Sequence, residues 1–338
     1  MVLCEERAER PGCYRHTHGK ASGVHMSGLA DFGIITIATG SAAFHDMARA
    51  LARSLERAGV RLPRAVVVDK SDTGLEAFFH HVLVTDALPR NFQSKLHLGR
   101  LTPFRRSVFL DVDCLVYEQF HAYLDQALRS PLCAPGELVV ERDWFGITPA
   151  IVGELAGSPR SYRLLHSGLF AFEREAGGVL LERALQLEPA LIDRFGVESP
   201  VSADILLSVS AAIAQLADHW PKDPAFVSPS LRWTRAPRLD IARRSALTFP
   251  NGRATSSRIV HFMGEHKSGR TYARERARLA ELVPRCDLQT AFEPATWHAG
   301  APALSLDYQL WSLQDGSRDA RELGESAVRR VLRRFQPR

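Results

Sequence analysis

Two aspartates one residue apart, Asp111 and Asp113, directly follow an apolar run in the segment RSVFLDVDCLV. Carboxylates at positions i and i+2, where a strand gives way to irregular backbone, can converge on one hard cation through their oxygens. A divalent ion between them offsets their repulsion and can also hold a diphosphate. The alternative is that both side chains end a strand and face water, which is common for Asp. The spacing therefore predicts either a metal site or a polar strand end.

The hydrophobic pattern predicts the elements that would carry this pair. Short β-branched apolar runs typical of buried strands occur just before Asp111 and in three earlier segments, 32–39, 65–69 and 80–86. Helices are expected between these strands, over 44–59 and 92–101. The alternation predicts a doubly wound α/β sheet, in which ligands bind beyond the carboxyl ends of the strands. Both aspartates fall at such an end.

Composition limits the classes of protein that fit. The 338 residues, 45% hydrophobic and 24% charged, are typical of a folded globular chain with one large domain or two small ones. A net charge of +5, carried mostly by Arg, fits anionic small substrates such as nucleotides and does not predict a nucleic-acid partner. The five cysteines form no CxxC pair or zinc-like spacing, so a reduced, cytoplasmic setting is expected.

Three segments, in the same order along the chain, resemble motifs of the glycogenin-like glycosyltransferases of family 8. SKLHLGRLTPFRRSVFLDVDCLV (94–116) resembles the segment that leads into the DxD motif of that family. HSGLFAFE (166–173) is similar to the family's Asn-Ser-Gly-Val/Leu-Phe strand, and IVHFMGEHK (259–267) to its His-Phe-x-Gly-x-x-Lys motif. The resemblance spans about 32–267 and is concentrated in these three segments.

The resemblance implies a GT-A fold, with a Rossmann-like, mainly parallel central sheet flanked by helices. It also implies a nucleotide-diphosphate sugar donor, usually a UDP-sugar, and a divalent ion on the DxD motif. The ion is expected to be Mn²⁺, with Mg²⁺ as the alternative, because an imidazole beside two carboxylates favours the transition metal. Transfer to an acceptor hydroxyl would retain the anomeric configuration. The acceptor can be a small molecule, a glycan or a protein.

Carried over position by position, the resemblance assigns metal and donor ligands. Asp111, Asp113 and His261 would bind the metal, and Asp111 would also lie near the donor ribose. Four further residues would contact the donor: Thr39, Lys95, Gly264 and Lys267. Gly264 would let the backbone approach the diphosphate, and Lys267 would place a point charge on its oxygens. Without the motif, His261 would be interpreted as a satisfied histidine after a strand and Lys267 as a surface lysine.

Lys95, Asp204 and His166 are the residues we expect in catalysis. Asp204 is similar to an Asp that faces the sugar and acceptor in the family, although it would also suit a helix start near Ser202. His166 stands where the family has Asn and could still donate a hydrogen bond to a sugar hydroxyl. This departure, with Ser268-Gly269 in place of Pro-Trp, leaves a second hypothesis open, a catalytically degenerate nucleotide-sugar-binding or scaffold protein.

The ends of the chain are predicted to lie outside the catalytic domain. Residues 1–30 are expected to form a mobile N-terminal extension, 31–290 the GT-A domain, and 291–338 a C-terminal extension with a basic amphipathic helix. That helix could make a peripheral contact with an acidic membrane surface, or dock on the body of the protein or on a second copy in a homo-oligomer. Three aromatic residues between the first two motifs line an acceptor groove or belong to the core: Trp144, Phe145 and Tyr162.

Overall fold

The computed structural model describes residues 32–288, apart from 128, 142, 158–160, 229–236 and 251–252. Both predicted extensions, 1–30 and 291–338, lie outside the described residues. The mobile character of the first and the basic amphipathic helix of the second therefore stay predictions.

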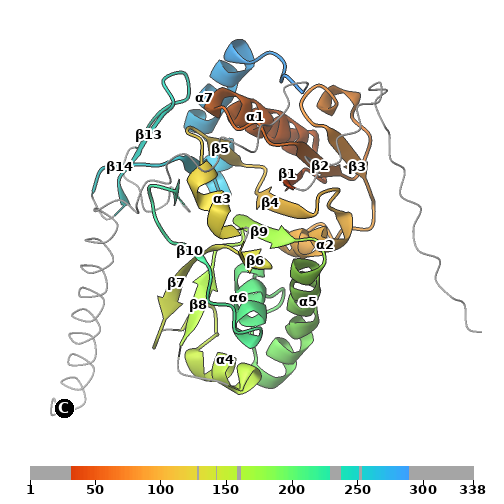
Figure 1. The fold of residues 1–338 in the computed structure, drawn as a ribbon, viewed down its shortest axis with the longest axis vertical. Helices are drawn as coiled ribbons and strands as arrows, with labels where there is room; N and C mark the ends of the chain where they lie inside the picture. The colour runs from red at the N-terminus through yellow and green to blue at the C-terminus, as the bar shows by residue number, and fades with distance from the viewer. Residues whose placement is uncertain are drawn as a thin grey trace, which may run out of the picture. The chain divides into compact units, whose positions relative to one another are not determined.

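A six-stranded sheet organises the chain, with strand order β3-β2-β1-β4-β9-β6 (Figure 1). The strands β1 to β4 are mutually parallel, whereas β9 runs antiparallel to β4 and β6 antiparallel to β9. Their bounds are β1 (Phe32–Ile37), β2 (Arg64–Val68), β3 (His81–Val84), β4 (Arg106–Leu110), β6 (Leu132–Cys133) and β9 (Leu169–Glu173). The predicted α/β class with a mainly parallel central sheet is confirmed.

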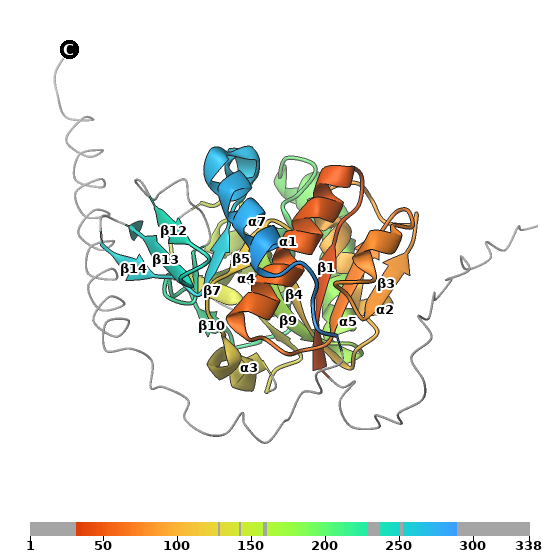
Figure 2. The same ribbon diagram turned by 90° about the horizontal axis from the view of Figure 1, so that it is seen from above.

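Helices cover both faces of this sheet. Alternate residues of β2 show the division, because Val66 and Val68 pack in one hydrophobic cluster and Ala65 and Val67 in the other. The first cluster contains apolar residues of α1 (Ala42–Ala58) and α7 (Arg270–Leu282), which lie side by side in Figures 1 and 2. The second contains residues of α5 (Ala176–Phe195) and α6 (Ala203–Ile213). The flanking helices predicted from the sequence are therefore present.

Smaller elements complete the described part. Short sheets contain β5 (Cys114–Val116), β7 (Pro135–Val139), β8 (Tyr162–Leu165), β10 (Trp220–Pro221), β11 (Val227–Ser228), β12 (Arg238–Asp240), β13 (Ser245–Thr248), β14 (Thr255–Ser256) and β15 (Ile259–His261). The remaining helices and 3₁₀ turns are α3 (His121–Ala127), α4 (Pro149–Ala156), α2 (Leu98–Leu101), η1 (Thr73–Leu75), η2 (Phe92–His97) and η5 (Gly264–Ser268).

The helix predicted over 92–101 differs from expectation. It is a 3₁₀ segment, η2, followed by the single α turn α2. The side chain of Asn91 accepts the backbone N–H of Gln93 at its start, and Thr102 is extended before a proline, which disfavours a helical conformation. The segment also packs closely, because a Cβ on Gly99 would lie 2.5 Å from Cα of Gly178 in α5. These constraints seat η2, and with it Lys95, against the sheet.

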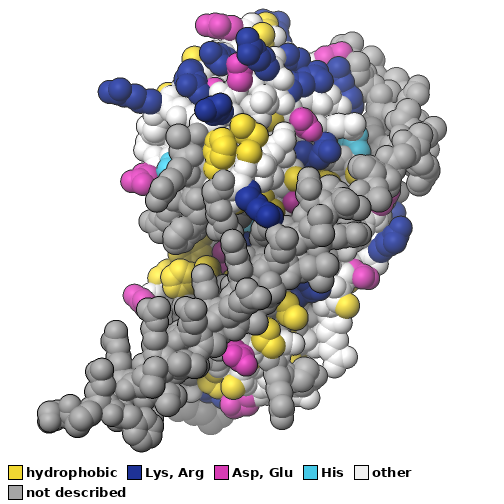
Figure 3. All heavy atoms as spheres, turned by 90° about the vertical axis from the view of Figure 1, so that its left-hand side faces the viewer, with side chains coloured by type: hydrophobic (Ala, Val, Ile, Leu, Met, Phe, Trp, Pro, Cys, Tyr) yellow, Lys and Arg dark blue, Asp and Glu magenta, His cyan; other side chains and the backbone are white. Residues whose placement is uncertain are grey.

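Much of the positive charge of α1 and α7 is paired within the chain. Lys and Arg side chains gather in the upper part of the face shown in Figure 3, over these two helices. Asp46 accepts from Arg49 at 2.8 Å and lies 3.5 Å from Arg276 across the two helices. Such exposed pairs contribute about 0.2–1 kcal/mol each to the free energy of unfolding.

Within the described residues, no helix is long and apolar enough to cross a membrane.

Candidate active site

The carboxyl end of β4 is held from both neighbouring strands. The hydroxyl of Thr36 in β1 donates to the carbonyl of Leu110 at 2.8 Å. On the other side, the backbone N–H of Asp111 donates to the carbonyl of Gly168, just before β9, at 2.9 Å. The chain moves from β1 to β2 and β3 on one side and returns as β4 on the other, so this edge lies where the strand order reverses. Ligands of open α/β sheets bind at such a switch point.

Lys95 reaches this edge from η2. Its Nζ lies 2.7 and 2.8 Å from the two carboxylate oxygens of Asp111 and 5.2 Å from the ring centroid of Phe109. The residue is only 7% exposed, so its ammonium depends on the carboxylate to compensate for lost hydration. The structure thus places Lys95 directly against the first aspartate of the DVD segment.

His261 brings the third motif to the same place. It is the last residue of β15, which pairs antiparallel with β5 so that His261 lies opposite Cys114. Its Nε2 lies 3.0 Å from Oδ1 of Asp113 and 3.5 Å from Oδ2 of Asp111. The backbone N–H of Phe262 donates to the carbonyl of Asp113 at 3.0 Å and fixes the two segments together. Both carboxylates therefore face one imidazole nitrogen.

The electrostatics of this cluster favour charge separation between His261 and Asp113. Burial opposes the ionisation of Asp113, but the charge and hydrogen bond of His261, with Lys267 and Lys95, outweigh it and lower its pKa. Burial likewise opposes the charged form of His261, and the nearby Asp113 and Asp111 overcome it, so its pKa is raised. Each of these two groups therefore favours the charged form of the other.

His166 contacts His261 from the other side. Its Nε2 lies 3.2 Å from Nδ1 of His261. Burial, with the positive charges of His261 and Lys95, lowers the pKa of His166 to about 3 against the opposing effect of Asp204, so this ring is neutral at pH 7. Gly168 leaves room for the pair, since a Cβ there would lie 2.6 Å from Cε1 of His261 and 2.9 Å from Nε2 of His166.

Asp204 lies in the first turn of α6, and its carboxylate points out of the helix. Oδ1 accepts the backbone N–H of Ser167 at 2.7 Å, while the helix start itself is capped by the hydroxyl of Ser202. The helix-capping interpretation of Asp204 therefore does not describe its side chain, which instead holds the segment before β9. Because Ser167 directly follows His166, this hydrogen bond places Asp204 beside the histidine pair.

The remaining predicted donor ligands lie on loops around the same edge. Gly264 has φ +65°, a left-handed conformation that favours glycine, at the start of η5. Lys267, in the same turn, lies with Nζ 5.5 Å from the ring centroid of Phe44, and its charge helps to lower the pKa of Asp113. Thr39 is half-buried just after β1. Ligand contacts of these three residues stay predictions.

Cys114 is a neighbour that motif reasoning missed. One ligand atom each of Asp113, Cys114 and His261 lie within 4.8 Å of one another. The thiol is fully buried, and burial together with the charges of Asp113 and Asp111 raises its pKa, so it is protonated in the metal-free protein. Its position opposite His261 follows from the β5–β15 register, for which the sequence contains no signal. Cys114, Cys133 and Cys286 are buried free thiols.

The side chains at this edge could hold a divalent ion. Carboxylate oxygens of Asp111 and Asp113 lie beside Nε2 of His261, and Cys114 borders the group. Hard oxygens with one imidazole nitrogen suit Mn²⁺, whereas thiolate ligation would favour a softer ion. The two carboxylates and the imidazole therefore fit the predicted metal.

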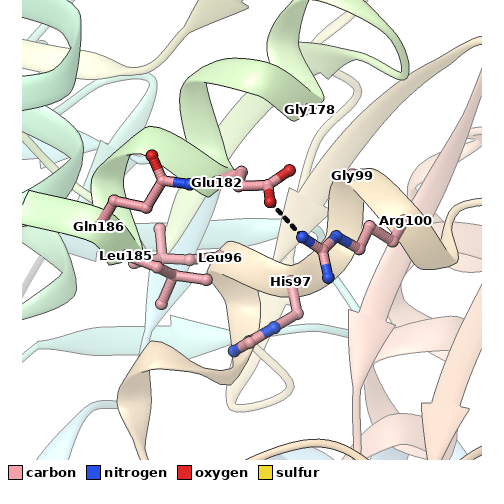
Figure 4. A pocket seen from close by; sticks show the side chains of 8 residues that line it. All are labelled: Leu96, His97, Gly99, Arg100, Gly178, Glu182, Leu185 and Gln186. Carbon is pink, nitrogen blue, oxygen red and sulfur yellow. Dashed lines mark hydrogen bonds and ion pairs between the residues drawn. The ribbon is translucent and has the colours of Figure 1, made fainter. Parts of the chain in front are cut away.

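Two further regions lie outside this cluster: the three aromatic residues predicted to line an acceptor groove or belong to the core, and a hollow between two helices. The core interpretation is correct for Tyr162, which is 4% exposed, and wrong for Phe145, which is 72% exposed at the tip of a turn with φ +51°. Trp144, directly before Phe145, is half-buried. A hollow of about 220 Å³ opens between α2 and α5, where Arg100 pairs with Glu182 (Figure 4). The residues that line this hollow do not include Asp111, Asp113 or His261.

Comparisons with known proteins add a distant likeness in chain path. No family model and no curated protein matches the sequence. An active-site mutant of LgtC aligns with a TM-score of 0.49 and 13% identity over 77% of this chain and 98% of the other. The galactosyltransferase LgtC in complex with donor and acceptor sugar analogs gives 0.45 and 14% over the same shares. The glycosyltransferase GlyE of Streptococcus pneumoniae gives 0.35 and 11% over 58% of this chain and 47% of the other. Similarity at this level carries no information on substrate.

Proposed function

We propose that this chain is a metal-dependent glycosyltransferase with a GT-A fold, which moves a sugar from a nucleotide-diphosphate donor, a UDP-sugar in the first instance, to an acceptor hydroxyl. The observation that carries the proposal is the convergence of both DVD carboxylates on Nε2 of His261, at the switch point of the sheet. The residues come from segments far apart in sequence. A polar strand end facing water would not require a buried histidine between the two carboxylates.

In this proposal, Asp111, Asp113 and His261 hold the ion, for which Mn²⁺ is the first choice. The ion, when bound, neutralises negative charge that accumulates on the diphosphate as the glycosyl–phosphate bond breaks. Lys267 adds a positive charge on the loop whose Gly264 lets the backbone approach the phosphates. Lys95 orients Asp111 through its ion pair. None of these roles needs a protein proton transfer.

We assign retention of configuration to attack by the acceptor hydroxyl on the face of the sugar from which the phosphate departs. Asp204 is the carboxylate beside the histidine pair that could be a nucleophile, but its Oδ1 accepts the Ser167 N–H at 2.7 Å. This hydrogen bond reduces its nucleophilicity and fits a positioning role better. The departing phosphate oxygen then accepts the proton of the acceptor hydroxyl. The family resemblance supports this choice.

Hydrolysis of UDP-sugars with and without Mn²⁺ tests the proposal, followed by mass spectrometry of candidate acceptors. We expect release of UDP from at least one donor, dependent on Mn²⁺ and absent in Asp113→Asn. Asp223→Asn is the matched control, because Asp223 is equally buried and lies outside the cluster. Mn²⁺-coupled UDP-sugar binding in thermal shift without any turnover would instead support the degenerate binding protein. No binding by either measure would contradict the proposal.

A further inference from the structure

The pair formed by His166 and His261 has a defined direction. Nδ1 of His261 and Nε2 of His166 lie 3.2 Å apart, and the ring centroids are 5.3 Å apart. A hydrogen bond between two ring nitrogens holds one proton, so one ring donates and the other accepts. Nothing in this pair alone decides which ring donates.

The other nitrogen of His261 supplies the direction. Its Nε2 faces Oδ1 of Asp113 at 3.0 Å, so in the metal-free protein it donates to that carboxylate. When a metal is bound in its place, Nε2 must be unprotonated, and a neutral imidazole then carries its proton on Nδ1. With the metal bound, the proton between the rings therefore belongs to His261. His166 therefore accepts with Nε2 and carries its own proton on Nδ1.

The backbone around His166 fixes this acceptor. The N–H of His166 donates to the carbonyl of Pro135 at 2.8 Å, and the next N–H, of Ser167, donates to Asp204. The carbonyl of Gly168, which follows, accepts the backbone N–H of Asp111, and a Cβ on Gly168 would have no space against the two rings. Residues 166–168 thus each make a defined backbone hydrogen bond, and these bonds hold the segment where Nε2 of His166 faces Nδ1 of His261.

We propose that His166 is a positioning residue that fixes the tautomer and orientation of His261, so that Nε2 is presented to a divalent cation together with the two carboxylates. The inference rests on the proposed function, because it concerns the same cation site. A partner on the far nitrogen locks a ligating imidazole and raises its basicity, and its loss lowers metal affinity about 10–100-fold. His166 thereby has a structural role at a position where the sequence predicts a contact with the sugar.

Mn²⁺ affinity, measured by electron paramagnetic resonance without any donor, tests this role. Three variants are compared with the wild type: His166→Leu removes the acceptor, His166→Gln places an amide oxygen near the site of Nε2, and His219→Leu removes a buried histidine outside the cluster. We expect His166→Leu to weaken Mn²⁺ binding about 10–100-fold and His166→Gln to restore it to within about threefold. His219→Leu should not change it. Circular dichroism identifies the temperature range in which each variant is folded.

The outcomes separate the inference from the proposed function. If the wild type binds no Mn²⁺, both fail. If the wild type binds Mn²⁺ and folded His166→Leu binds it equally well, only the inference fails. A normal Mn²⁺ affinity combined with a raised KM for the donor in His166→Leu would also overturn it, and would assign His166 to the sugar. Equal losses in the Leu and Gln variants would show that size, not the acceptor atom, matters, and would contradict the inference.

Discussion

Replacing Gly168 by Ala adds one methyl group at the point where the two histidine rings meet. The new Cβ would lie 2.6 Å from Cε1 and 2.8 Å from Nδ1 of His261, and 2.9 Å from Nε2 of His166. Gly168 is buried. Its carbonyl accepts the N–H of Asp111, and the carbonyl of Pro135 accepts the N–H of His166, so hydrogen bonds hold the backbone on both sides. The rings, not the backbone, must therefore move.

The required movement sets the expected size of the effect. Ordinary contact begins near 3.4 Å, so the closest atom of His261 must retreat from 2.6 to 3.4 Å, about 0.8 Å. Metal sites tolerate only about 0.2 Å in ligand distance, and a misplacement near 1 Å in an active site costs about 100-fold. We expect Gly168→Ala to weaken Mn²⁺ binding and Mn²⁺-dependent hydrolysis by that order. The overpacking should also lower the free energy of unfolding by about 1–3 kcal/mol.

A matched variant separates loss of ligation from loss of stability. Gly33→Ala in β1 creates an equally close contact, with its Cβ 2.4 Å from Cε2 of Phe104, but it lies away from the cluster. It should lose similar stability and keep its Mn²⁺ affinity. Calorimetric Mn²⁺ titration of both variants, below their melting temperatures, makes the comparison. Unchanged Mn²⁺ affinity in folded Gly168→Ala, or equal losses in both variants, would refute the reasoning.

Other predictions concern the charges of the cluster. Because the pKa of His261 is raised on folding, the metal-free protein should lose stability as pH rises through that pKa. Denaturant titrations across pH measure this loss, and His261→Gln should abolish it. An unchanged pH profile in His261→Gln would contradict the prediction. Below that pKa, Mn²⁺ should bind about tenfold more tightly for each unit by which pH rises, since binding displaces one proton from His261. A pH-independent Kd would show that His261 is no ligand. Lys95→Met leaves Asp111 without its ion pair, so the donor KM should rise and kcat should fall at least about tenfold in UDP-release assays. Wild-type kinetics in this variant would contradict a role for Lys95 in the site.

Much of the sheet could be predicted from sequence because its signals are local. Each parallel strand is a short β-branched run followed by a helix or turn, and the runs before Ala38, Asp69 and Asp111 were located to within two residues. The position of the DVD segment at the carboxyl edge follows from the same pattern. The sequence predicts one helix over 92–101, whereas the structure has a 3₁₀ segment and a single α turn; the close approach of Gly99 to Gly178 is a tertiary contact that no local pattern shows.

The cluster itself was only partly predictable. The motif resemblance named Asp111, Asp113 and His261, but their approach depends on the register of two three-residue strands, β5 and β15, which are too short for a periodic signal. Cys114 was missed for the same reason. The contact between His166 and His261 depends on side-chain rotamers and on the space left by Gly168, which no sequence pattern shows. The sugar contact expected at His166 stays a prediction.

Anomalous scattering at the manganese edge, from crystals grown with Mn²⁺ and UDP, tests the central claim most directly. We predict one strong peak within coordination distance of carboxylate oxygens of Asp111 and Asp113 and of Nε2 of His261, with the diphosphate on its open side next to Lys267. A peak elsewhere, or UDP bound at this edge with no metal among these three side chains, would contradict the account.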